Sequence, residues 1–112
     1  MKFDTDKEGL HTLFRPYQAL LLGHLWELNR ESRVGVNSRQ AHRFLLDKPE
    51  KMSRASVINF LNDMVDEGIL NYEEKTGKGG YHRVYYPKMD REEFSVYVTE
   101  LIKKKLNEVF PV

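Results

Sequence analysis

Hydrophobic residues in the first third of the chain recur at the three- and four-residue spacing of an α-helix. The clearest run lies in residues 15–29, and its apolar positions are Tyr17, Leu20, Leu21, Leu25 and Leu28. Pro16 suits the first turn, because a proline at that position loses no hydrogen bond. We therefore predict a first helix over this stretch.

A second, shorter helix is predicted to begin at Asn37 or Ser38, since either side chain can cap its free N–H groups. It runs to about Leu46, and Pro49 ends it. The stripe that this helix buries consists of Ala41, Phe44 and Leu45.

A third helix, from about Arg54 to Glu67, has well-marked ends. Ser53 is its predicted N-cap, Met52 and Val57 are placed as a hydrophobic staple, and Gly68 follows the last periodic residue. One side of the helix is apolar. The other side is small and amide-rich near its start and acidic near its end, and consists of Ala55, Ser56, Asn59, Asn62, Asp63 and Asp66.

Strand-like segments follow this helix. Residues 69–74 and 81–87 are rich in branched and aromatic side chains and flank the glycine-rich residues 75–80, which predicts a β-hairpin. Asp90 and Glu93 then form a capping pair for a last helix. Its apolar face consists of Phe94, Tyr97, Val98, Leu101, Ile102, Leu106 and Val109, with Lys105 inside it. Such a face must either fold back onto the core or bury against a second copy.

Composition narrows the possible classes of protein. A chain of 112 residues suits one domain, and 40% hydrophobic with 31% charged residues excludes a membrane protein. We expect a soluble chain, and a cytoplasmic one because its start lacks the apolar run of a secretory signal. The absence of cysteine excludes disulfides, thiolate metal sites and cysteine nucleophiles.

The positive charge is concentrated in one segment. The whole chain carries a net charge of +1, but residues 30–60 contain seven basic and three acidic residues, which is a net +4. Residues 61–87 contain three basic and five acidic residues, a net −2. A local basic patch suits a polyanionic partner, although a solvated segment that collects arginines would look the same.

The order helix, helix, helix, strand, strand, helix is the layout of a winged helix-turn-helix, in which the third helix enters the major groove of DNA and the hairpin lies beside it. We therefore predict a mainly α fold with a small β-hairpin. Asn59 and Asn62 could pair bidentately with adenine, and Arg54 could reach guanine or a phosphate. The residues predicted to contact DNA are Arg39, Arg43, Ser53, Arg54, Ser56, Asn59, Asn62, Lys75, Lys78, His82 and Arg83.

Other functions are less well supported by the sequence. The four histidines lack the spacing of metal ligands. The sequence also contains no recognisable pair of a nucleophile and a general base, so we do not predict an enzyme. We therefore predict no metal and no cofactor. The hairpin could be a plain turn, since its glycines need nothing more than positive φ. The main alternative to a DNA-binding regulator is a winged-helix module that binds protein within a larger transcription or replication assembly.

Three segments, "LLGHLW", "MSRASVINFLNDMVDEGIL" and "YYPKMDREEF", resemble the signature stretches of the penicillinase-repressor family of winged-helix regulators, parts of which the PadR and MarR types share. Ala55 and Asp63 depart from the family, which usually has basic residues there. The resemblance implies a repressor that binds a palindromic operator as a homodimer. It divides the chain into an N-terminal extension (1–13), a DNA-binding domain (14–88) and a C-terminal dimerisation helix (89–112). The implied dimer interface consists of Phe94, Tyr97, Val98, Leu101, Ile102, Lys105 and Val109.

Overall fold

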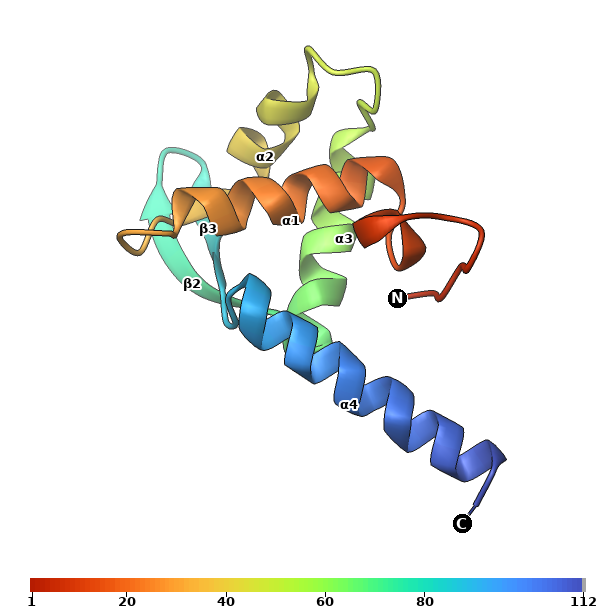
Figure 1. The fold of residues 1–112 in the computed structure, drawn as a ribbon. Helices are drawn as coiled ribbons and strands as arrows, with labels where there is room; N and C mark the ends of the chain where they lie inside the picture. The colour runs from red at the N-terminus through yellow and green to blue at the C-terminus, as the bar shows by residue number, and fades with distance from the viewer. Residues whose placement is uncertain (112) are drawn as a thin grey trace.

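The fold combines four α-helices with a three-stranded antiparallel sheet in residues 1–111, the part of the chain that the computed structural model describes (Figure 1). The elements are a short 3-10 helix (Gly9–Thr12), α1 (Pro16–Leu28), β1 (Val36–Asn37), α2 (Ser38–Leu45), α3 (Arg54–Asp66), β2 (Leu70–Gly77), β3 (Gly80–Pro87) and α4 (Arg91–Val109). The predicted order of helices and hairpin strands is therefore confirmed.

The helix starts lie where the capping residues predict them. The Asn37 side chain accepts a hydrogen bond from the Gln40 backbone N–H at 2.8 Å, and Ser53 Oγ accepts one from Ser56 N–H at 3.2 Å. Asp90 caps α4 in the same way. Each cap satisfies an N–H group that has no partner inside its own helix.

The sheet is larger than the predicted small hairpin. The two hairpin strands have eight residues each, and only Lys78 and Gly79 separate them. Gly79 and Gly80 have φ angles of +94° and +103°, which other residues rarely adopt. The two-residue strand β1, which the sequence analysis does not predict, pairs with β3, so that the sheet order is β1-β3-β2.

The hydrophobic core lies between the first three helices and the base of the sheet. Its fully buried side chains come from α1, α2, α3 and the turn into β2. The buried face of α1 differs from the predicted stripe, because Leu22 and Trp26 are buried whereas Leu28 lies exposed at the helix end. Trp26 also donates a hydrogen bond from Nε1 to the Met89 carbonyl at 3.0 Å, which fixes the start of α4 against α1.

Helix α4 packs on the rest of the chain only as far as Ile102 (Figure 1). Phe94 and Val98 are 3% and 9% exposed and lie in the chain's own core. The prediction that they belong to a dimer interface therefore needs correction, because they leave little surface for a second copy. The remaining residues of α4, 103–109, which we call its second half, project away from the core, and the molecule measures 56 × 28 × 26 Å.

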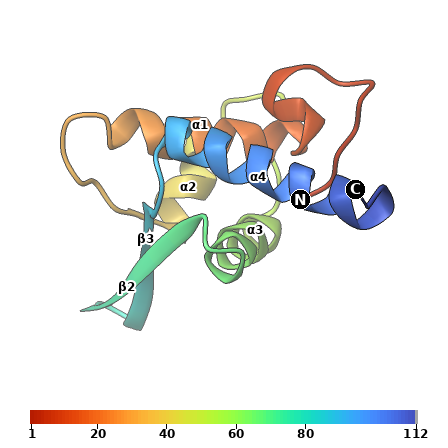
Figure 2. The ribbon, with the colours of Figure 1, turned by 60° about the horizontal axis from the view of Figure 1, so that its bottom comes forward.

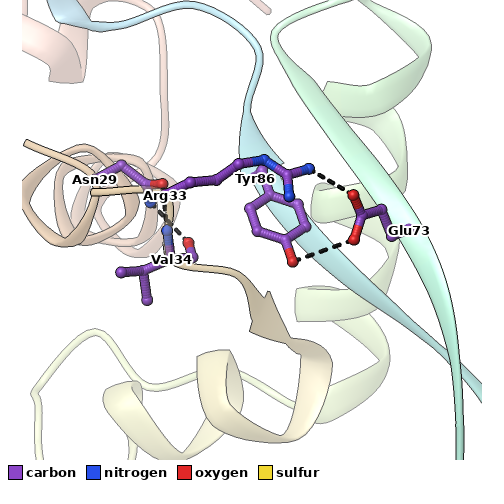
Figure 3. Close-up of polar contacts among 5 residues, drawn as sticks. All are labelled: Asn29, Arg33, Val34, Glu73 and Tyr86. Carbon is purple, nitrogen blue, oxygen red and sulfur yellow. Dashed lines mark hydrogen bonds and ion pairs between the residues drawn. The ribbon is translucent and has the colours of Figure 1, made fainter.

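The loop between α1 and β1 is held against the outer face of the sheet (Figure 3). Asn29 receives and donates hydrogen bonds of 2.8 Å with the backbone of Val34, which closes the loop. Arg33 then lies 3.5 Å from the Tyr86 ring centre and bonds Glu73 at 2.8 Å. Arg33, one of the arginines that give residues 30–60 their positive charge, thus has a partner within the chain.

The N-terminal residues 1–13, which the sequence analysis treats as an extension, fold back on themselves. The Asp4 N–H donates to the Thr12 carbonyl at 2.7 Å, and Leu10 and Leu13 pack against the core.

None of the helices in residues 1–111 combines the length and apolar character that a membrane-spanning segment requires.

Candidate nucleic-acid interface

The solvent-facing side of α3 presents a small set of polar groups at its start. Arg54, Ala55 and Asn59 are exposed, while Ser56 is half-buried. The hydroxyl of Ser53 donates to Ser56 Oγ at 3.0 Å, so both serines are engaged in the cap. Arg54 and Asn59 are therefore the predicted contact residues of α3 whose side chains are freest to meet a partner.

Two further basic residues lie on α2, the helix that packs on α3. Arg39 and Arg43 are both exposed. Because they are four residues apart in one helix, they lie on the same face. They add two positive charges to one side of α2.

Asn62 has a different role from the one predicted. Its Oδ1 accepts a hydrogen bond from the Tyr85 hydroxyl at 2.5 Å and another from Arg83 Nη1 at 3.1 Å. A bidentate pair with adenine requires both the oxygen and the amide nitrogen of an asparagine. Since the Asn62 oxygen already has two donors, this side chain connects α3 to the hairpin and has no free acceptor for the predicted pair with adenine.

This contact places the hairpin beside α3 on one side of the molecule (Figure 2). Burial raises the pKa of the Tyr85 phenol, although the nearby Arg83 cation acts in the opposite direction. The phenol thus stays a hydrogen-bond donor to Asn62. A rigid connection between a helix and a hairpin is what allows both to contact one ligand in a fixed register.

The predicted hairpin residues do not share one surface. Paired residues in an antiparallel sheet lie on the same face, and neighbours along a strand alternate. Glu74 pairs with Arg83 and Lys75 pairs with His82. Arg83 therefore lies on the face toward α3, whereas Lys75 and His82 lie on the opposite face, and the exposed Lys78 lies at the tip between them.

The face of the hairpin toward α3 also carries aromatic side chains, which are not among the residues predicted to contact DNA. The Arg83 guanidinium lies 4.0 Å from the centre of the Tyr72 ring. Tyr81, two residues before Arg83, is on the same face by alternation and is 79% exposed. Alternation in the sequence could have identified Tyr81, but only once the turn was known to consist of Lys78 and Gly79.

The outer face of the sheet carries the Arg33 contacts. The pKa of the Glu73 carboxyl lies below its usual value, mainly because Arg33 donates a hydrogen bond to it. The Tyr86 hydroxyl donates to the same carboxylate at 3.4 Å. These groups pair with one another and so hold the loop rather than offer free charge to a ligand.

The far end of α3 is acidic and borders a groove. Asp63, Asp66 and Glu67 are exposed there. Together with the N-terminal segment they line an open groove of about 940 Å³, which has Phe14 and Met64 at its floor. Acids at this end would repel phosphates, so only the first half of α3 suits a polyanion.

The arrangement of the histidine and acidic side chains bears on the prediction of metal sites. Residues 1–111 contain no group of three or more histidine, cysteine, aspartate or glutamate side chains that could hold a metal ion. His24 stacks on the Phe44 ring with 3.8 Å between ring centres. Burial, and then the charge of Lys48, lower the pKa of His24. This histidine therefore packs between α1 and α2.

Comparison with known proteins finds no match among protein-family models, curated proteins or solved structures. The resemblance of the sequence to the penicillinase-repressor family therefore stays a prediction.

Proposed function

We propose that the chain is a cytoplasmic, sequence-specific DNA-binding regulator, most simply a repressor, with a winged helix-turn-helix fold. One observation carries the proposal: the exposed start of α3, with Arg54 and Asn59, is fixed beside the hairpin through the hydrogen bonds of Asn62. In this fold class the helix reads the major groove and the hairpin contacts the DNA next to it.

Base recognition falls to two side chains of α3. Asn59 can pair bidentately with adenine, and Arg54 can pair with guanine or bind a phosphate. A good bidentate pair discriminates against a wrong base by about 1–3 kcal/mol. The helix enters the groove with its first half, since Asp63 and Asp66 at the other end would repel the backbone.

Backbone binding falls to the basic groups around α3. Arg39 and Arg43 come from α2, and Lys78 comes from the tip of the hairpin. Phosphate contacts of this kind fix register and supply affinity without reading sequence. A homodimer would double them on a palindromic site, and the uncovered second half of α4 supports that assembly.

The proposal is tested by selecting bound DNA from a random duplex pool at low salt and by measuring the mass of the protein in solution. The expected result is an enriched palindrome whose half-sites lie about 34 Å apart, together with the mass of a dimer. A pool that shows no enrichment would remove the sequence-specific function.

Two substitutions separate base recognition from backbone binding. Asn59→Ala should relax the preference at one base pair of each half-site and leave the other positions unchanged. Arg43→Ala should weaken binding to all sequences by a similar factor. Asn62→Ala should loosen the hairpin without abolishing preference for adenine, because its oxygen already bonds Arg83 and Tyr85.

The exposed acids at the end of α3 favour a second candidate, a module that binds a basic protein surface. Asp63, Asp66 and Glu67 carry this alternative. It predicts a monomer that binds DNA weakly and without preference. The same selection and mass measurement therefore distinguish the two functions.

A further inference from the structure

The apolar stripe of α4 continues beyond the part that the chain covers. Phe94 and Val98 bury the first half of the stripe in the core. Farther along the same face, Leu106 and Val109 are 52% and 66% exposed. A continuous stripe of this kind on a projecting helix needs a partner surface for its second half.

The second half of α4 also carries the run Lys103, Lys104 and Lys105. Lys103 lies 3.9 Å from Glu100 and Lys105 lies 3.2 Å from Glu108, both within α4. Within the part of the chain that the structure describes, Lys104 makes no such ion pair. A surface that covers this helix should therefore combine apolar groups with acids.

The groove at the end of α3 has this combination. Leu13, Phe14 and Met64 form part of its apolar floor, and Asp63 and Asp66 line the wall that α3 contributes. Its volume of about 940 Å³ gives room for several side chains. The lining also includes Lys2, Lys7 and Arg15, so a helix in the groove would meet basic as well as acidic groups.

We propose that the second half of α4 of one copy lies in this groove of a second copy, with Lys104 and Lys105 against Asp63 and Asp66, and that the contact is reciprocal. The inference rests on the proposed homodimer and specifies its interface. A two-fold dimer makes the contact twice, which doubles the buried area. Direct pairing of the two projecting helix halves would instead bring two lysine runs together.

Charge reversal tests the contact. The variants are Lys104→Glu/Lys105→Glu and Asp63→Lys/Asp66→Lys, each studied without DNA by analytical ultracentrifugation at low salt. Each variant alone should dimerise at least about tenfold more weakly, because like charges then meet at both contacts. An equimolar mixture should restore the dimer, since the heterodimer has one reversed contact and one natural contact, and both are attractive.

The mixture also shows that the variants fold, because unfolded chains could not restore a dimer. Arg30→Glu/Lys88→Glu is the matched control, since both residues are exposed and lie outside the groove. This variant should dimerise as strongly as the natural chain. A dimer that Asp63→Lys/Asp66→Lys leaves intact would overturn the groove contact in favour of helix-to-helix pairing. A natural chain that stays monomeric would overturn the inference. The selection of bound DNA tests the proposed function independently of this contact.

Discussion

At the scale of single residues, Tyr85 connects the sheet to α3, because its hydroxyl donates a hydrogen bond of 2.5 Å to Asn62 Oδ1. Tyr85→Phe removes the donor and keeps the ring. We predict that it lowers the free energy of unfolding by about 1 kcal/mol, the usual net value of such a bond, because Arg83 still bonds the Asn62 oxygen. Urea unfolding measures the change. Tyr81→Phe is the control and should be neutral, since that hydroxyl is exposed; equal losses in both variants would contradict the assignment.

His24 gives a second prediction at this scale, for pH. Its pKa in the folded chain lies below the ordinary value of 6.5, through burial and then through Lys48. The unfolded chain therefore binds more protons near that pH. The contribution of His24 to stability should be complete above pH 6.5 and should be lost as the pH falls from 6.5 to the lowered pKa of the folded state.

Urea unfolding at pH values on both sides of 6.5 tests this prediction. The difference between the natural chain and His24→Gln should shrink as the pH falls, because only the natural chain loses this contribution. Lys48→Met should raise the pKa of His24 in an NMR titration, since it removes a nearby positive charge. A His24 that titrates at its ordinary value would contradict the burial argument.

For Asn62, the sequence predicts the position of the side chain on α3 but not its hydrogen-bond partners. Its place on the polar side of α3 follows from helical spacing. Its partners Arg83 and Tyr85 are 21 and 23 residues away, and spacing within one helix cannot identify them. Asn59 has no such neighbour on the hairpin, so its prediction as a contact residue is unchanged.

Among the elements, the loop before β1 lies unusually close to the sheet. A Cβ added at Gly35 would lie 2.2 Å from Val84 Cγ1 and 2.6 Å from the Tyr86 ring. Gly35→Ala should therefore destabilise the chain by about 1–3 kcal/mol, the usual cost of overpacking. Thermal or urea unfolding measures it.

Gly23 is the matched control within α1. A Cβ there would meet only Arg91 Nη2, at 3.8 Å, which is an ordinary contact. Gly23→Ala should stabilise the chain by up to about 1 kcal/mol, because alanine favours a helix. Similar effects of the two substitutions would contradict the close approach of the loop.

Elements that depend on neighbouring residues could be predicted from the sequence, whereas strand β1, which follows this loop, could not. Helix starts follow from Asn37, Ser53 and Asp90, because a cap acts within three residues of its own position. Strand β1 has two residues, too few for a pattern, and Val36 pairs with Tyr85, which is far along the chain. Its formation depends on the folded loop and sheet and leaves no local signal.

For the whole molecule, the distribution of charge matters more than its total. Asp63 and Asp66 lie at one end of α3, and Arg54 lies at the other. The segment charges predicted this division, because it runs along the sequence. The surroundings of the second half of α4 could not be predicted in the same way, since none of the other residues in 1–111 covers it.

Salt dependence tests the whole assembly on DNA. Each phosphate contact contributes about 0.9 to the slope of log binding constant against log salt concentration. Lys78, exposed at the hairpin tip, should contact one phosphate in each copy. Lys78→Ala in a dimer should therefore reduce the slope by about 1.8, and in a monomer by about 0.9. Fluorescence anisotropy over a salt series measures both, with Lys88→Ala as a control that should leave the slope unchanged. An unchanged slope for Lys78→Ala would place the hairpin tip away from the DNA backbone.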